Sequence, residues 1–335
     1  SRIRDPEGRA RRCMDETGRR IMRLARWGWL CANPRLGLVG LAMLWHVPVQ
    51  AEPSIQIQRM VRLGQYANAS ASIRTGLESN PQNADLHALA GTVFSRSGLY
   101  ADALPAFLLA QESAYYESEG LYAHADALRE TGSPEAAAEL RSQRLLASGL
   151  DDSRELIIGL GLVDDYIRSG DFDLADETLH YLHTLWPRSP ALHGHMADYY
   201  LELGDIESAD FHLWYITEAL GLRLGMRGMF ATYRIHLHHG DLNEAQRVLD
   251  EAMELHKKNL RLRARQAELY RLQGDSKDAL EGLRAQRFWF QMHPEMRAVE
   301  ALALYELGET TEARELAALL IDLYPGHAAL EHVEH

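Results

Sequence analysis

The feature that most constrains the fold is a glycine that recurs along the chain, always with an alanine five positions later. The glycines are Gly64, Gly98, Gly132, Gly170, Gly204, Gly240, Gly274 and Gly308, at intervals of 34, 34, 38, 34, 36, 34 and 34 residues. The alanines are Ala69, Ala103, Ala137, Ala175, Ala209, Ala245, Ala279 and Ala313. A fixed period of this length is typical of repeat proteins, in which each unit is one supersecondary structure. We therefore predict a stacked array rather than a single globular core.

The residues around each glycine predict a helix–turn–helix unit. Helical periodicity precedes the glycine, as in LHGHMADYYLELG, which ends at Gly204. Glycine commonly ends a helix because it adopts a left-handed conformation without strain. Asp171, Asp205, Asp241 and Asp275 directly follow four of the glycines, where aspartate can cap the next helix. The alanine is expected where the two helices of a pair approach most closely, because a larger side chain would force them apart.

This pattern resembles the tetratricopeptide repeat (TPR) family. The copy from Ala84 to Glu117 carries the family residues Gly91, Phe94, Gly98, Tyr100, Ala103, Phe107 and Ala110. The resemblance implies an all-α fold, a right-handed α-solenoid of about eight repeats. The repeats run over 50–83, 84–117, 118–151, 156–189, 190–223, 226–259, 260–293 and 294–327. We assign the solenoid to 52–327 and a short tail or partial cap helix to 328–335.

The third copy departs from the pattern. Pro134 stands where an aromatic belongs, Arg141 and Arg144 replace helix-packing residues, and four extra residues, Asp152 to Glu155, follow. We expect the array to be loosest, or locally kinked, at this junction.

Residues 1–51 read as a basic leader with an export signal. They contain ten arginines and four acidic residues, followed by the uncharged run LGLVGLAMLWHVPV. An uncharged run of fourteen residues is short for a membrane span, which needs about twenty, but suits the core of a signal peptide. We predict cleavage after about Ala51 and a periplasmic or otherwise exported body with no stable membrane span; the alternatives are an uncleaved anchor and a cytosolic protein. We expect translation to start at Met14 or Met22, with the preceding residues a translation artefact.

Charge and cysteine content exclude several classes of function. The formal charge is −13, and because the leader carries +6, the rest carries −19. Such an acidic body disfavours nucleic acid and anionic membranes as partners. Cys13 and Cys31 both lie in the leader, so the body has no disulfide, thiol nucleophile or cysteine metal ligand. No catalytic motif is present, and we predict a non-catalytic protein without cofactor.

In the TPR family the first helix of each pair lines the concave face, and this resemblance implies a charged groove. Acidic positions come first, with Glu119, Asp126, Glu130, Asp164, Asp198 and Glu202 near Tyr122 and His195. Basic positions follow, with Arg227, Arg234, Arg261, Arg265 and Arg271 near Phe230 and His238. We predict that the groove binds a peptide, loop or helix of a protein partner of the bacterial envelope through Arg227, Phe230, Arg234, Arg261, Arg265, Arg271, Tyr122, Asp126, Asp164 and Asp198. The alternative is that these side chains are ordinary solvated helix faces.

Two other functions stay open at this point. One is an assembly or polysaccharide-export accessory factor of the envelope, with Trp186, Tyr199, Trp214 and Trp289 as sugar platforms. The other is a metal-binding module formed by His180 and His183, or by His236, His238 and His239. Metal ligand sets need three or four convergent groups, so packing or surface histidines explain these pairs better.

The C-terminal end predicts an apolar edge. The eighth repeat ends in ARELAALLIDLYPG, and the nine residues that follow are too few for a full cap helix. Repeat arrays need a polar cap because the last helix otherwise exposes apolar surface. We expect this end, at Leu319 and Leu323, to contact a second copy of the chain or a larger partner, or to be a frayed terminus.

Overall fold

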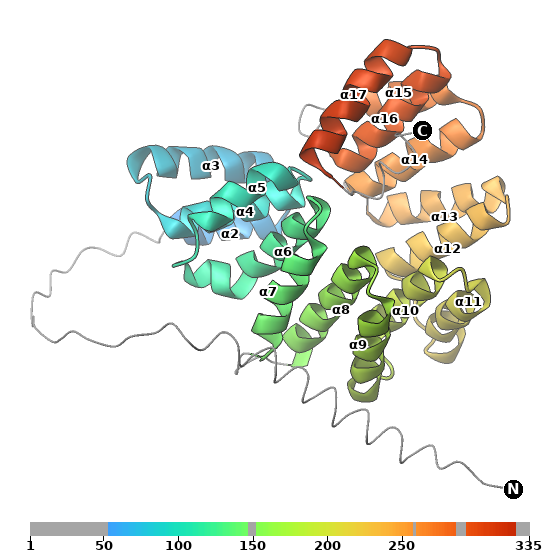
Figure 1. The fold of residues 1–335 in the computed structure, drawn as a ribbon, viewed down its shortest axis with the longest axis horizontal. Coiled ribbons are helices and arrows are strands. Elements are labelled where there is room, and N and C mark those ends of the chain that lie inside the picture. Colours follow the sequence, from blue (N-terminus) through green and yellow to red (C-terminus); the bar gives the residue numbers. More distant parts are fainter. Residues whose placement is uncertain (1–52, 147–151, 257–258, 286–292, 326–335) are drawn as a thin grey trace, which may run out of the picture. The chain divides into compact units, whose positions relative to one another are not determined.

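The fold is built from paired helices. The computed structural model describes residues 53–146, 152–256, 259–285 and 293–325, shown in colour in Figure 1. Within these residues there are sixteen α-helices, two π-helical turns and no β-strand. The pairs are α2 (Pro53–Arg62) with α3 (Tyr66–Ser79), α4 (Ala84–Arg96) with α5 (Tyr100–Leu108), α6 (Leu121–Glu130) with α7 (Pro134–Leu146), α8 (Asp152–Ser169) with α9 (Phe172–Leu185), α10 (Pro190–Glu202) with α11 (Ile206–Trp214), α12 (Met226–His238) with α13 (Leu242–Leu255), α14 (Leu260–Leu272) with α15 (Ser276–Arg284), and α16 (Pro294–Glu306) with α17 (Thr310–Leu323). The π-helical turns are η1 (Tyr116–Gly120), which precedes α6, and η2 (Tyr215–Ala219), which extends α11. The prediction of an all-α repeat solenoid is confirmed.

The recurring glycine and alanine have the roles that their chemistry predicts. All eight glycines have positive φ, between 68° and 90°, and each lies between the two helices of a pair. All eight alanines are buried, seven of them at 0% exposure and Ala313 at 4%. Glycine therefore turns the chain, and alanine lets the paired helices meet.

Aspartate caps three of the four second helices where we expected it. The carboxylates of Asp171, Asp205 and Asp241 accept hydrogen bonds from the backbone N–H groups three residues later, at 3.3, 3.0 and 3.3 Å. Asp275 makes no such bond. Each cap satisfies one of the N–H groups that the first turn of a helix leaves without an intrahelical acceptor.

The two ends of the array contact each other. The largest hydrophobic core cluster contains residues of α2 to α6 together with residues of α14 to α17. Tyr100 of α5 packs edge-on against Tyr324, with ring centroids 6.4 Å apart, and against His293 at 6.5 Å. Repeats of a solenoid ordinarily contact only their neighbours. Here the last repeat also packs on the second, and we refer to this as the end contact.

The end contact corrects our expectation of an uncovered C-terminal edge. Leu320 and Tyr324 are buried in the shared cluster, and Leu323 packs against it half-buried. Leu319 is exposed. Part of the edge is therefore covered by the chain's own second repeat, and self-association stays a prediction. The expected tail or partial cap helix at 328–335 lies outside the described residues.

Arg141 of the third repeat, which we expected to disturb helix packing, is instead part of the packing. This side chain is only 3% exposed, and its guanidinium forms ion pairs with Asp126 and Asp165. A Cβ built on Gly161 of α8 would lie 2.5 Å from Arg141 Nε, so the missing side chain at Gly161 makes room for it. Arg141 is therefore a packing residue that joins α7 to α6 and α8. Residues 147–151 of the junction lie outside the described residues.

Candidate functional site

The predicted charged residues come from the first helices of consecutive pairs, and we call the surface they share the first-helix face. Ion pairs connect α6, α8, α10, α12, α14 and α16 across it. The acidic and basic stretches that the sequence predicts therefore do meet. They meet by pairing with each other, which the sequence did not indicate.

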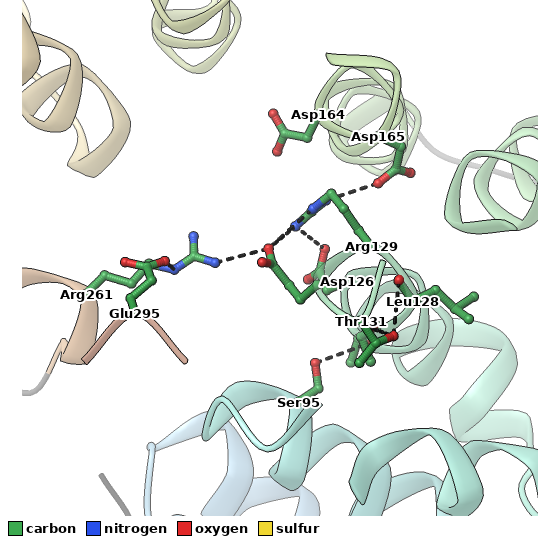
Figure 2. Close-up of polar contacts among 12 residues, drawn as sticks. Ser95, Asp126, Leu128, Arg129, Thr131, Asp164, Asp165, Arg261 and Glu295 are labelled. Atoms are coloured by element: carbon green, nitrogen blue, oxygen red, sulfur yellow. Dashed lines mark hydrogen bonds and ion pairs between the residues drawn. The ribbon is translucent and has the colours of Figure 1, made fainter. Parts of the chain in front are cut away.

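The first group of ion pairs centres on Asp165 of α8. Arg129 donates to Asp126 and to Asp165, both at 3.1 Å, and Arg141 pairs with the same two carboxylates. The Asp165 side chain is 0% exposed, whereas that of Asp126 keeps 44%. Burial raises the pKa of Asp165 to about 6, against the lowering effect of the two guanidiniums. Figure 2 shows Arg129 between the carboxylates of α6 and α8.

The second group centres on Arg227 of α12. Its guanidinium donates to Asp164 and to Asp198, both at 2.7 Å, and so bridges α8 and α10. Arg234, two turns later, pairs with Glu202 at 2.8 Å and approaches Asp198 at 3.6 Å. Gly194 of α10 lies beside the Arg227 stem, where a Cβ built on it would meet both Arg227 Cβ and the backbone nitrogen of Gly228 at 3.7 Å. The backbones of α10 and α12 are therefore in close contact beside these pairs.

The third group connects repeats far apart in the sequence. Arg261 of α14 contacts Glu130 of α6, 131 residues away, at 3.4 Å. It also contacts Glu295 of α16 at 3.2 Å, and Figure 2 shows these two side chains together. Arg265 pairs with Glu268 at 2.9 Å and approaches Glu295 at 3.8 Å. These pairs lie beside the end contact and add polar contacts to it.

Neighbouring charges set the ionisation of this surface. Burial by itself would raise the pKa of Asp164, but Arg227, His195, Arg129 and Arg141 lower it to about 2. Burial, assisted by Arg227, lowers the pKa of His195 to about 4, although its Nε2 lies 3.7 Å from Asp164. The attraction of Glu295 holds the pKa of Arg261 above its usual range. At neutral pH the face therefore carries ionised carboxylates and guanidiniums with an uncharged imidazole among them.

All ten predicted partner-binding residues are half-buried. The eight charged ones, Arg227, Arg234, Arg261, Arg265, Arg271, Asp126, Asp164 and Asp198, all take part in ion pairs within the chain. Phe230 packs against a core cluster of α12 to α14.

Sequence reasoning missed five members of these three groups: Arg129, Arg141, Asp165, Glu268 and Glu295. Glu295 is the second residue of its repeat, as Arg227 and Arg261 are of theirs, so the register could have identified it. Arg141 stood out only as a departure from the family pattern. Asp165 gave no signal, because it follows the predicted inward residue Asp164 and faces α7.

The other candidate sites find little support. No group of three or more potential metal ligands occurs among the residues that the structure describes. His180 is exposed on α9, and His238 and His239 are exposed at the end of α12 with ring centroids 5.5 Å apart. Tyr199 is buried and Trp186 packs against the core, so these two cannot serve as sugar platforms; Trp289 lies outside the described residues. Over the described part of the chain, no helix has the length and apolar character needed to cross a bilayer.

Comparisons with known proteins agree with the repeat architecture. Family models described as tetratricopeptide repeat match residues 57–117, 236–303 and 300–327. No curated protein matches the sequence.

Among solved structures, the APC/C hetero-tetramer Cut9–Hcn1 has 15% identity and a TM-score of 0.53, covering 86% of this chain and 57% of that one. PilW, a type IV pilus biogenesis factor, has 16% identity, a TM-score of 0.47 and coverage of 62% and 93%. A repeat protein from Parabacteroides merdae has 12% identity, a TM-score of 0.47 and coverage of 84% and 96%. At 15% identity the likeness to Cut9–Hcn1 concerns the fold alone. The two structures with a TM-score of 0.47 add no further argument.

Proposed function

The chain is a tetratricopeptide repeat protein, and we propose that it is a non-catalytic scaffold whose first-helix face binds a segment of a partner protein. The mechanism is exchange of ion pairs. Carboxylates and basic groups of the partner replace intramolecular contacts of Arg234, Arg261 and Asp126, while the neighbouring pairs hold the helices in place. Such complementarity supplies specificity and speeds association more than it adds raw affinity.

One observation carries this proposal: the arginines of the face are bound and yet reachable. The side chains of Arg227, Arg234, Arg261 and Arg265 are 35–42% exposed although each contacts a carboxylate. The side chain of Arg141, in contrast, is only 4% exposed, so a partner cannot reach it and its role is structural. A half-exposed ion pair contributes little to stability, so exchanging its partner costs little.

The test removes two arginines whose carboxylates retain support. Without Arg261, Glu130 still contacts Arg129 and Glu295 still lies near Arg265; without Arg234, Asp198 keeps Arg227. We expect the Arg234→Gln/Arg261→Gln variant to bind about tenfold more weakly to the partner that wild-type protein captures from a native envelope extract, a loss of about 1.4 kcal/mol. The partner is identified by mass spectrometry and its affinity measured by calorimetry.

The control carries the same change of charge on second helices. Arg247→Gln/Arg284→Gln removes two exposed arginines of α13 and α15 and should bind as wild type does. Circular dichroism melting confirms that both variants are folded. Equal affinity of the two variants would move the binding site away from the first-helix face.

We further propose that the scaffold works in the bacterial envelope after export. The support is the basic leader with its fourteen-residue apolar run before Ala51. Protein recovered from the producing bacterium should begin at Glu52, as intact-mass spectrometry would show, and should fractionate with the periplasm. A mature chain that retains residues 36–49 would contradict cleavage, and a cytosolic location would contradict export.

A further inference from the structure

A cluster of aromatic and imidazole rings lies in the fourth and fifth repeats and shares no residue with the ion pairs of the first-helix face. It spans α9, α10, α11 and η2 (Figure 1). Its members are His183, His193, Tyr200, Phe211, His212, Trp214 and Tyr215, linked by ring centroid distances of 4.4–6.4 Å. We call this the ring cluster.

Hydrogen bonds fix the base of the ring cluster. His193 Nε2 lies 3.0 Å from the Pro187 carbonyl, and His193 Nδ1 lies 2.9 Å from His212 Nδ1. A carbonyl only accepts, so Nε2 of a neutral His193 carries the proton and its Nδ1 accepts from His212. Burial lowers the pKa of His212 to about 4, and of His193 below its usual value, so both rings are neutral at pH 7. Tyr200 stacks on the His212 ring with centroids 5.4 Å apart and so gives that ring a second contact.

The outer end of the cluster is exposed. Phe211 keeps 53% of its surface exposed and Trp214 keeps 51%, whereas Phe107, Tyr233 and Tyr324 keep 2% or less. The two exposed rings lie 5.9 Å apart. Directly after Trp214 the helix widens into the π-helical turn η2, a local irregularity that often marks functional sites. Tryptophan and aromatic neighbours on a rigid base are the residues that most often dominate binding energy at interfaces.

The second helices of these two repeats, with the turn that extends α11, carry charges of one sign only. Helices α9 and α11 and turn η2 contain six carboxylates, Asp173, Asp176, Glu177, Glu207, Asp210 and Glu218, and no lysine or arginine. None of the six takes part in an ion pair with another of the described residues. Arginines occur only in the loops that follow, at Arg188 and Arg223. The surface therefore differs from the first-helix face, where acidic and basic groups neutralise each other.

We propose that the ring cluster is a second docking surface, whose occupant is a basic segment of a protein in which arginine or lysine alternates with apolar residues. Apolar side chains of the segment cover Phe211 and Trp214. A guanidinium or ammonium group can lie over the Trp214 face, where the ring quadrupole attracts a cation. The remaining basic groups face the unpaired carboxylates.

The rim argues against two other occupants. A second copy docked through the same patch would place the six carboxylates of one chain against those of the other, and like charges across an interface oppose association. An anionic bilayer would meet the same repulsion. A cationic segment is the partner that this combination of charge and exposed aromatic surface fits.

Peptide titration tests the proposal. Two short synthetic peptides are used, one alternating arginine with leucine and the other alternating glutamate with leucine. We expect the arginine peptide to bind the purified protein and the glutamate peptide not to bind. The Phe211→Ala/Trp214→Ala variant should bind the arginine peptide with an affinity lower than that of wild type by about tenfold or more. The Glu207→Gln/Asp210→Asn/Glu218→Gln variant should bind the arginine peptide with an affinity lower by about threefold or more. This affinity should also depend less on salt concentration than that of wild type.

Matched variants keep the test specific. Tyr305→Ala removes a 58% exposed aromatic of α16, and Glu254→Gln/Glu281→Gln/Glu315→Gln removes three exposed carboxylates of other helices. Both should bind the arginine peptide as wild type does, and so should Arg234→Gln/Arg261→Gln, which separates this surface from the first-helix face. Equal binding of the two peptides, an unchanged affinity of the Phe211→Ala/Trp214→Ala variant, or a dimer in sedimentation that this variant dissociates would overturn the proposal.

Discussion

Replacing Arg141 with methionine is expected to destabilise the array by about 3 kcal/mol, at the lower end of the range for removing one partner of a buried ion pair. Methionine fills much of the space of the arginine stem but leaves Asp165, which is 0% exposed, with Arg129 as its remaining partner. The loss should appear in the urea midpoint and as faster amide hydrogen exchange in α7 and α8.

Two further variants decide whether the ion pair is the cause. Arg141→Met/Asp165→Asn removes the buried negative charge as well and should recover at least half of the loss. Arg247→Met breaks an exposed pair with Glu244 and should cost less than about 0.5 kcal/mol. If Arg141→Met lowers the free energy of unfolding no more than Arg247→Met does, the junction does not depend on the Arg141–Asp165 ion pair. The packing role of Arg141 is then wrong.

Gly132→Ala is expected to weaken the contact between the two ends of the array. Gly132 has φ +84°, and a Cβ at this position would overlap the backbone carbonyl oxygen of Pro325. The left-handed conformation alone costs an alanine about 1–2 kcal/mol. Because a backbone atom cannot rotate away as a side chain can, Pro325 must move, adding about 1–3 kcal/mol of packing loss. Hydrogen exchange should increase in α5 and α17, where Tyr100 packs on Tyr324.

The chain supplies the control for this experiment. Gly170 has φ +78° at the same repeat position, and nothing lies within 4 Å of a Cβ built on it. Gly170→Ala should therefore show the conformational cost alone, without faster exchange in α17. Equal effects of the two substitutions on stability and on exchange would mean that the end contact contributes nothing to the fold.

Most of the fold could be predicted from local sequence. The positive φ of Gly204, the cap made by Asp205 and the burial of Ala209 all follow from chemistry within six residues of one another. Because each repeat encodes its own turn and its own close helix contact, the eight-fold recurrence predicted the architecture. Arg141 was misjudged because burial of a charge depends on a partner from the next repeat, and the family pattern has no place for it.

The candidate site was predictable only in part. The repeat register placed Asp198, Arg227 and Arg261 on first helices and so on a shared face. It could not show that Arg227 bridges two carboxylates, because side-chain length and helix separation decide which charges meet. The ring cluster was missed as well, since His183, His193 and His212 come from three different helices and only their packing brings the rings together.

The sequence by itself therefore determined the repeating unit, its number of copies and the helix that each charged residue occupies. These depend on backbone conformation and on contacts between adjacent helices, which are encoded within one period of 34–38 residues. Tertiary structure alone decided that Arg261 reaches Glu130 and that Tyr100 meets Tyr324. The physical reason is accumulation: each repeat rotates slightly against the one before, and the sum of these rotations, which no single repeat encodes, determines which distant residues come into contact.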